Sequence, residues 1–366
     1  MVDGRMISNT GIGRWIQNIV THLVKIKSDH KITVLVNRDS ERVRSFGIET
    51  RRLHFSAPAY SLREQMLMPI ELRSSQPDVV HYPNFNLALM DRTPSVLTLC
   101  DLIYFLFPQA CPSWIGHQYA RGMIRMAARK ARRIITLSKY SKRDLVQHLG
   151  CPESKITVIY PAIDCAVFHP RHDSASVAAA TRRLGIRKPY IFYTGNHEPR
   201  KNLPRLVEAY RTLAKRKQYQ LVLGGRIDSR RQAFYDSIQD LVASGDVILC
   251  GEIAESDLPL VYAGANLFVF PSTYEGFGLP PLEAMATGVP VVCSSSTSLP
   301  EVVGDAAVTF NPENIDDLLR AMNLVMGSKQ LSGELREKGR RQVQRFSWHT
   351  AANHVMSIYQ EVAQAG

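Results

Sequence analysis

Residues 270–292 read FPSTYEGFGLPPLEAMATGVPVV and contain the features that decide the fold. A buried strand is expected to end at Pro271, a glycine-containing loop follows, and Pro280 and Pro281 are acceptable in the first turn of a helix. The run VPVVCS at 289–294 then predicts a second strand. A strand, a helix and a strand in this order are typical of a parallel sheet with crossover helices, so the stretch predicts an α/β fold.

The same alternation of strands and helices runs through the chain. In the first half we expect strands at residues 31–36, 78–83, 95–100, 133–138 and 155–161. In the second half we expect strands at residues 190–195, 220–225, 247–252, 266–272 and 289–294. Two such series predict two doubly wound, Rossmann-like domains, 1–170 and 171–346, with a cleft between them at the carboxyl ends of the strands. Only Met1 to Asp3 precede the first loop, so we expect a shortened first strand.

The composition excludes several classes of protein. With 366 residues, of which 45% are hydrophobic and 21% charged, the chain is globular rather than disordered. Its six cysteines form no C-x-x-C pair, which excludes zinc ribbons and thioredoxin-type motifs and is typical of free thiols. The first residues lack the apolar core of a signal peptide, and no apolar run approaches the roughly 20 residues that span a bilayer. We therefore expect a soluble, cytoplasmic protein.

The positive charge is concentrated in the first half. The formal net charge is +12, of which residues 1–180 carry +10. This field predicts a negatively charged partner, such as nucleic acid, anionic lipid or a phosphorylated substrate. One predicted helical face collects Arg121, Arg125, Arg129, Arg132 and Arg133. No aromatic residues alternate with these arginines, which argues against single-stranded nucleic acid. A functional face of this kind would bind anionic lipid, at the inner face of the plasma membrane, or a lipid-diphosphate acceptor. A solvated face over a core-packed helix is the favoured interpretation.

The loop after Pro271 has the composition of an anion site. Gly276 and Gly278 permit close backbone approach, and the helix after them offers unbonded N–H groups and the positive end of its dipole, which suit a diphosphate. Glu275 and Glu283 lie at the two ends of this cradle, where one carboxylate can contact a sugar and the other a ribose diol. A helix-capping Glu283 and a solvated Glu275 are the alternative.

Arg200 and Lys201 follow the predicted strand at 190–195 and therefore lie at the same edge of the second domain. A diphosphate bound at this edge needs permanent positive charge, which these two side chains would supply. Two solvated basic residues at a helix start are the alternative.

The phrase EGFGLPPLEAMATGVPVV, at residues 275–292, resembles the E-x7-E region of the retaining glycosyltransferase family 4, whose members have the GT-B fold. Three further segments are similar to the same family: TGNHEPRKNLPRLVEAY (194–210), DGRMISNTGIGRWIQNIV (3–20) and SLPEVVGDAAVTFNP (298–312). The end of the chain resembles the family's last helix, which crosses back to the first domain, so we expect the helix at 347–366 to pack there.

The resemblance implies a role for each part of the site. The first domain would hold the acceptor and the second the nucleotide-sugar donor, and transfer would be a front-side displacement with retention. Arg200, Lys201 and the loop amides would stabilise the leaving diphosphate. Glu275 would hold the donor sugar and Glu283 the ribose. The loop residues implied to line the donor are Gly276, Phe277, Gly278 and Leu279.

Gly11 and Gly13 precede the first predicted amphipathic helix and are expected to approach the same diphosphate. They do not form a dinucleotide fingerprint, because Ile16 occupies the third glycine position. A plain loop is the alternative.

On the acceptor side, His81 is expected at the end of a strand with Asn84 just beyond it. The imidazole can bond sugar hydroxyls or act as a base, unless it is a structural histidine. Asp101 is expected to be a further acceptor contact. Cys100 stands where relatives commonly have a histidine that contacts the donor sugar, and a thiol is a poor hydrogen-bond partner.

No D-x-D pair or histidine spacing suggests a metal site, so we expect a metal-independent enzyme without a cofactor. The phrases DVVHYPNF and HEPRKN are most like bacterial mannosyltransferases of surface-polysaccharide assembly, including lipopolysaccharide, which makes GDP-mannose the expected donor and a glycan or lipid-linked glycan the expected acceptor. Two alternatives stay open: a degenerate GT-B domain that acts as a membrane scaffold, and an NAD-dependent dehydrogenase.

Overall fold

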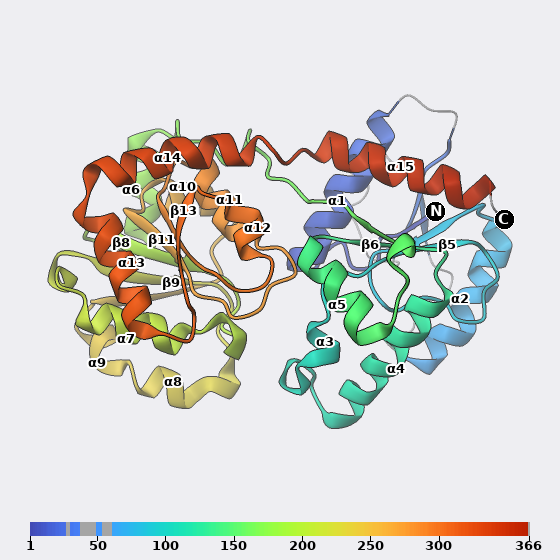
Figure 1. Cartoon of the computed structure of the whole chain (residues 1–366), viewed down its shortest axis with the longest axis horizontal. Coiled ribbons are helices and arrows are strands. Elements are labelled where there is room, and N and C mark those ends of the chain that lie inside the picture. Colours follow the sequence, from blue (N-terminus) through green and yellow to red (C-terminus); the bar gives the residue numbers. More distant parts are fainter. Residues whose placement is uncertain (27–29, 37–48, 53–60, 365–366) are drawn as a thin grey trace. The chain divides into compact units, whose positions relative to one another are not determined.

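The computed structural model describes residues 1–26, 30–36, 49–52 and 61–364. The chain forms two compact units, of which unit 1 comprises Met1–Pro161 and Ser347–Gly366, and unit 2 comprises Ala162–Phe346 (Figure 1). The first boundary therefore falls after Pro161, earlier than the expected position at residue 170. The polar, alanine-rich stretch beyond it forms helix α6 (Ser174–Arg183) of unit 2.

Unit 1 is built on a parallel sheet of seven strands in the order β3-β2-β1-β4-β5-β6-β7. The strands are β1 (Val2–Asp3), β2 (Thr33–Val36), β3 (Glu49–Arg52), β4 (Val80–Tyr82), β5 (Ser95–Thr98), β6 (Arg133–Thr136) and β7 (Ile156–Val158). The order reverses between β1 and β4, which makes the sheet doubly wound. Strand β3 was not expected, because its sequence, ETRR, contains no apolar residue. Only its backbone pairing with β2 identifies this segment as a strand.

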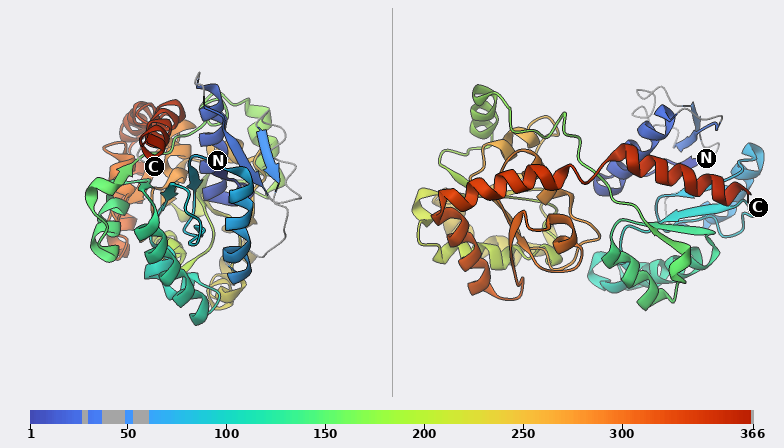
Figure 2. Two further views of the ribbon diagram at one scale, coloured as in Figure 1. Left: turned by 90° about the vertical axis from the view of Figure 1, so that its right-hand side faces the viewer. Right: turned by 45° about the horizontal axis from the view of Figure 1, so that its top comes forward.

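Crossover helices cover both faces of this sheet, with α1 and α15 on one side and α4 and α5 on the other (Figures 1 and 2). The helices are α1 (Thr10–Lys25), α2 (Leu62–Ser75), α3 (Ile103–Leu106), α4 (Trp114–Lys130), α5 (Lys139–Leu149) and α15 (Trp348–Gln364). Helix α4 ends at Lys130, so Arg132 and Arg133 do not belong to the expected arginine face. Arg133 lies in β6 and donates to the Ser154 carbonyl and to Thr157 Oγ1 at 2.6 and 3.1 Å.

Helix α15 belongs to unit 1 although it lies at the end of the chain. One side of it is apolar, because its buried residues recur at helical spacing: Trp348, Ala351, Ala352, Val355, Met356, Ile358 and Val362. The Trp348 ring lies 5.9 Å from the ring of Trp15 in α1. This apolar face and its polar contacts with β4 explain why the helix packs on the first sheet.

His81 provides one of those polar contacts, which corrects its expected place at the acceptor. It is the middle residue of β4, it is 1% exposed, and its Nδ1 lies 2.6 Å from the Tyr359 hydroxyl of α15. Its Nε2 lies 2.7 Å from Thr98 Oγ1. Burial lowers the pKa of His81 to about 3. With both nitrogens bonded inside the unit, His81 is a structural histidine.

Unit 2 has a parallel sheet of six strands in the order β10-β9-β8-β11-β12-β13. The strands are β8 (Tyr190–Thr194), β9 (Gln220–Gly224), β10 (Val247–Gly251), β11 (Leu267–Phe270), β12 (Val291–Ser294) and β13 (Ala307–Phe310). Together with α6, the helices are α7 (Leu203–Thr212), α8 (Gln232–Asp236), α9 (Gln239–Ala243), α10 (Leu258–Ala263), α11 (Leu279–Ala286), α12 (Leu299–Val303), α13 (Ile315–Gly327) and α14 (Lys329–Val343). Its core contains a cluster of aromatic rings, in which Phe192 lies 5.1 Å from Tyr262 and 5.9 Å from Phe268.

In the part of the chain that the structure describes, no helix has both the length and the apolar character that crossing a membrane requires.

Replacing His81 by glutamine should flatten the pH dependence of folding stability in acid. The unfolded histidine binds a proton near pH 6.5, whereas the folded one does so only near pH 3. Between these values the unfolded state holds the extra proton. This group therefore lowers the free energy of unfolding of the wild type by roughly 1 kcal/mol for each unit by which the pH is lowered. Denaturant unfolding across the window measures the slope, and an equal change in the exposed control His148→Gln would contradict the assignment.

Candidate active site

The loops that follow β8 and β11 lie where the strand order of unit 2 reverses. The two strands are direct neighbours and run parallel, so both loops emerge at the same edge of the sheet. The first loop carries Arg200 and Lys201, and the second carries Glu275. Ligands of doubly wound sheets bind at this switch point.

The first loop is fixed to the second by hydrogen bonds that end on backbone carbonyls, most of them from side-chain donors. A short 3-10 turn, Pro199–Lys201, ends at Asn202, which has a left-handed backbone with φ of 59°. The side-chain Nδ2 of Asn202 donates to the Pro271 carbonyl at 3.2 Å and to the Pro312 carbonyl at 2.8 Å. In the other direction, the Thr273 N–H donates to the Arg200 carbonyl at 2.8 Å. These bonds set where the two cations project.

Both cations meet the carboxylate of Glu275. Lys201 Nζ contacts one carboxylate oxygen, and Arg200 Nη1 lies 3.1 Å from the other. Lys201 is 7% exposed and its ammonium lies 5.1 Å from the centre of the Phe270 ring at the end of β11. Arg200 also donates to Glu198 at 2.9 Å. Three residues that the sequence analysis singled out therefore form one charge cluster, in which Lys201 and Glu275 are buried and Arg200 is half-buried.

The two charges of the pair depend on each other. Burial tends to raise the pKa of Glu275, but the positive charges of Lys201 and Arg200 outweigh it and hold that pKa below its usual value. Burial lowers the pKa of Lys201, and the Glu275 carboxylate opposes this effect. Removal of either partner would leave the other charge buried and uncompensated, which is strongly destabilising in proteins.

The glycine loop leads from this cluster into α11. Gly278 has φ of 110°, which strains any residue with a side chain, and a Cβ atom there would also displace the Leu299 side chain, whose Cδ2 would lie 2.6 Å away. Gly276 is buried, and Leu279 is half-buried at the first position of the helix. Pro280 follows within the first turn, where a missing N–H costs nothing. The loop therefore presents backbone groups at the helix start, as a diphosphate cradle requires.

Phe277 has a packing role, which differs from the expected donor contact. It is 4% exposed, and its ring lies 5.6 Å from the ring of Phe346 in an edge-to-face arrangement. The Phe277 carbonyl accepts a hydrogen bond from Ser298 Oγ at 2.8 Å.

Glu283 lies one helical turn into α11 and is 2% exposed. Its carboxylate accepts a hydrogen bond from the Tyr262 hydroxyl of α10 at 2.8 Å. The neutral donor fixes the orientation of the carboxylate without cancelling its charge. Sequence reasoning missed Tyr262, because a buried tyrosine in an apolar run gives no sign of its hydroxyl partner.

Thr297 and Ser298 are further residues that sequence reasoning missed. The Glu275 N–H donates to Thr297 Oγ1 at 3.1 Å, and Ser298 Oγ donates to the Glu275 carbonyl at 2.9 Å. Both backbone groups of Glu275 are therefore bonded to this segment. The only signal in the sequence is the hydroxyl-rich run SSSTS at 294–298.

The structure places Gly11 and Gly13 inside the first turn of α1, which begins at Thr10, and not in a loop before it. A Cβ atom at position 13 would collide with the Ile7 carbonyl, so this glycine is required by packing within unit 1. No atom lies within 4 Å of the position that a Cβ at Gly11 would occupy, so packing does not require glycine there.

The other expected acceptor residues hold turns beyond the strand ends. Asn84 is 7% exposed, and its side-chain oxygen accepts from the Asn86 N–H at 2.7 Å. Asp101 Oδ1 accepts from the Ile103 N–H at 2.9 Å, at the start of α3. Burial raises the pKa of the adjacent Cys100 thiol, so it is not a reactive thiolate. Asn84 and Asp101 both lie beyond the carboxyl ends of their strands, but His81 does not.

A buried ionic network lies at the carboxyl ends of the strands of unit 1, and the sequence analysis did not predict it. Arg5, just beyond β1, pairs with Asp3 at 2.6 Å and with Glu64 at the start of α2. Glu64 also accepts from the Asn86 amide. Four polar residues from three segments thus hold the loops after β1 and β4 together.

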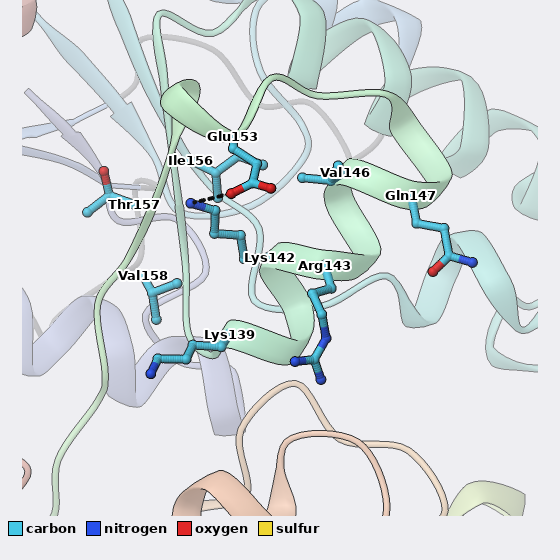
Figure 3. Close-up of a pocket in the computed structure, with 9 residues that line it drawn as sticks. All are labelled: Lys139, Lys142, Arg143, Val146, Gln147, Glu153, Ile156, Thr157 and Val158. Atoms are coloured by element: carbon cyan, nitrogen blue, oxygen red, sulfur yellow. Dashed lines mark ion pairs between the residues drawn. The ribbon is translucent and has the colours of Figure 1, made fainter.

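A hollow of about 680 Å³ lies on unit 1 between α5 and the edge strand β7 (Figure 3). Lys139, Lys142 and Arg143 line it from the first turns of α5. Glu153 pairs with Lys142 at 3.6 Å, and Ile156 contributes an apolar wall. The hollow therefore combines excess positive charge with apolar surface.

Among the described residues, no group of three or more histidine, cysteine or carboxylate side chains is arranged to hold a metal ion. The charge cluster of unit 2 contains two cations, both paired with carboxylates, and the loop after Glu275 leads to the N–H groups at the start of α11. These are the groups that bind phosphate oxygens and stabilise developing negative charge.

Two family profiles match the chain, "Glycosyl transferases group 1" at residues 180–342 and "Glycosyltransferase Family 4" at residues 9–167. The chain is 29% identical to O-antigen chain mannosyltransferase B of Escherichia coli over 96% of both chains. It is 26% identical to O-antigen chain mannosyltransferase RfbU of Salmonella typhimurium over 60% of this chain and 57% of that protein.

Solved structures share the fold. Sucrose-phosphate synthase of Thermosynechococcus elongatus superposes with a TM-score of 0.78 at 20% identity, covering 97% of this chain and 94% of that one. HepE of Anabaena, solved with UDP and glucose, gives a TM-score of 0.78 at 19% identity over 98% of both chains. With two doubly wound units and profile matches that together span most of its length, the chain belongs to the family 4 glycosyltransferases and has the GT-B fold.

Proposed function

We propose that the protein is a retaining mannosyltransferase, which moves mannose from GDP-mannose to a glycan or lipid-linked glycan in the assembly of a surface polysaccharide such as lipopolysaccharide. The charge cluster of Arg200, Lys201 and Glu275 at the switch point of unit 2 carries this proposal. The names of the bacterial relatives support the choice of mannose and of the pathway.

The roles of the residues follow from their chemistry. Arg200 and Lys201 bind the donor diphosphate and take up the charge that develops on it as the glycosidic bond breaks. Glu275, held at a fixed position by the same cations, bonds the donor sugar. Glu283, oriented by Tyr262, bonds the ribose diol. The backbone of Gly276 to Leu279 completes the diphosphate contacts.

We propose that this chemistry needs no divalent metal. Two side-chain cations and the N-terminal N–H groups of α11 supply positive charge where a metal ion would otherwise do so.

Unit 1 is proposed to hold the acceptor. The hollow between α5 and β7 offers Lys139, Lys142 and Arg143 beside apolar residues, which suits a phosphate-bearing, partly apolar acceptor such as a lipid-linked glycan. Asn84 and Asp101 remain candidates for sugar contacts, but the buried His81 does not.

We further propose peripheral association with anionic membranes through the outward sides of α2 and α4. The two carboxylates of α2, Glu64 and Glu71, are buried, and α4 contains none. The exposed apolar side chains of these helices are Met66, Ile70, Trp114, Ile115 and Met126. The exposed arginines are Arg63, Arg73, Arg125 and Arg129. Arginine beside apolar side chains is the composition of surfaces that bind anionic bilayers.

A donor panel tests the proposed activity directly. GDP, UDP, ADP and NAD are compared by thermal shift, and GDP-mannose is then offered with a chelator present. We expect GDP at about 100 times its Kd to add roughly 2.7 kcal/mol of stability. The released or transferred mannose should keep its anomeric configuration.

A flat response to every nucleotide would refute the donor site, and stabilisation by NAD alone would favour the dehydrogenase. GDP binding without turnover would favour the scaffold, and an absolute need for magnesium would contradict metal independence.

Substitution of the two glutamates should affect different kinetic constants. Glu283→Gln should mainly raise KM for the donor, because ribose contacts are equal in ground and transition states. Glu275→Gln should mainly lower kcat, by on the order of 10²-fold, because it alters both the sugar contact and the charge around Lys201. The exposed Glu313→Gln serves as the control, and circular dichroism confirms folding, since both site residues are buried. Wild-type kcat in Glu275→Gln, or interchangeable effects of the two changes, would refute the assignment.

Sedimentation with anionic vesicles tests the membrane surface. Binding at low salt should fade at high salt, because each basic side chain contributes only about 1 kcal/mol and is screened. The double change Arg125→Glu and Arg129→Glu should abolish binding, whereas Arg182→Glu on the exposed side of α6 should not. Equal loss in both variants would mean that net charge, rather than this surface, drives association.

A further inference from the structure

Thr297 has a backbone conformation that its residue type disfavours. Among the described residues, only Gln76, Asn202 and Thr297 combine a side chain with a positive φ, and that of Thr297 is 56°. A β-branched residue in the left-handed region is a genuine outlier, because its branched Cβ crowds the backbone. Such outliers persist only when the surrounding structure imposes them, and they cluster at functional sites.

The other two positions have ordinary explanations. Gln76 ends α2, and left-handed residues are common at the ends of helices. Asn202 is a residue type that tolerates the left-handed region. Thr297 ends no helix and precedes α12 by two residues, so helix capping does not account for its conformation.

The conformation of Thr297 is associated with a hydrogen bond to its hydroxyl. Thr297 Oγ1 accepts the N–H of Glu275 at 3.1 Å, while the neighbouring Ser298 Oγ bonds the carbonyls of Glu275 and Phe277 at 2.9 and 2.8 Å. One short segment thus bonds the N–H and the C=O of the same residue. A glycine at position 297 would adopt the positive φ without cost, but it could not accept this N–H.

The contact between Thr297 and the Glu275 backbone also affects the position of the Glu275 carboxylate in the charge cluster. Its carboxylate lies between Lys201 and Arg200, where a small backbone shift would lengthen both ion pairs. The rigid sheet ends at Phe270, so residues 271–278 depend on contacts such as these for their position. Misplacement by about 1 Å is enough to lower a rate by two orders of magnitude.

We propose that Thr297 is a positioning residue of the donor site, which holds the Glu275 backbone so that the carboxylate stays between Lys201 and Arg200. The proposal rests on the proposed transferase function for its kinetic consequences, but the contact itself is independent of that function. Thr297 touches Glu275 and acts through it.

Three substitutions separate positioning from a merely structural role. Thr297→Gly removes the hydroxyl and relieves the backbone, Thr297→Val keeps the branched shape without the hydroxyl, and Thr297→Ser keeps the hydroxyl. Gln76→Gly is the matched control, because it relieves a positive φ at a helix end in unit 1.

We expect Thr297→Gly to melt within a few degrees of wild type, because relief of the strained φ offsets the greater freedom of the unfolded chain. Its kcat should nevertheless fall by on the order of 10-fold, as for other residues that orient a functional side chain. Thr297→Val should lose a similar factor, Thr297→Ser should stay within about 2-fold of wild type, and Gln76→Gly should leave kcat unchanged. A purely structural threonine would instead change kcat only in step with the melting temperature.

Hydrogen exchange at the Glu275 amide provides a readout that needs no activity. Exchange should accelerate in Thr297→Gly and Thr297→Val, and it should stay at the wild-type rate in Thr297→Ser and Gln76→Gly. Wild-type exchange at this amide in Thr297→Gly, or wild-type kcat together with faster exchange, would overturn the proposal. An inactive wild-type protein would refute the proposed function, and the exchange measurement would then still decide whether Thr297 holds Glu275.

Discussion

The buried ion pair between Lys201 and Glu275 is the interaction on which the arrangement of unit 2 depends. Burial of two charges costs several kcal/mol per ion, and their attraction repays that cost only when the geometry is held closely. Here the geometry comes from loops after two adjacent parallel strands, joined by Asn202 and by backbone bonds. Arg200 pairs with Glu198 as well as with Glu275, so the four charges of the cluster balance, and a donor diphosphate would compete with these carboxylates for the two cations.

The packing beneath this cluster explains why the loops hold their positions. Strand β11 ends at Phe270, whose ring lies under the Lys201 ammonium, and the aromatic core continues through Phe268 and Phe192. Gly278, with its positive φ, packs against the Leu299 side chain of α12, so the glycine loop is in contact with the helix that follows β12. Close packing of this kind transmits small shifts, and therefore ties the loop surface to the core.

In unit 1, buried polar groups hold the loops and helix α15 in place. Arg5 joins Asp3 and Glu64 beneath the loops after β1 and β4, and His81 joins β4 to Tyr359 of α15. Each buried polar atom in these bonds has a partner, which is the condition for burying it at acceptable cost. The loops that are proposed to meet the acceptor are thus anchored to polar networks, whereas the cradle of unit 2 is anchored to an aromatic core.

The sequence by itself determined the parallel α/β architecture, most strands and the residues of the charge cluster, because hydrophobic periodicity and the spacing of glycine, proline and charged residues are local properties. It did not reveal strand β3, which exists only through backbone pairing with β2, nor the buried place of His81, which depends on a tyrosine 278 residues away. The tertiary structure alone decided that Gly13 serves packing and that Thr297 meets Glu275. The physical reason is that each of these roles is defined by a partner distant in the chain, and local pattern carries no information about that partner.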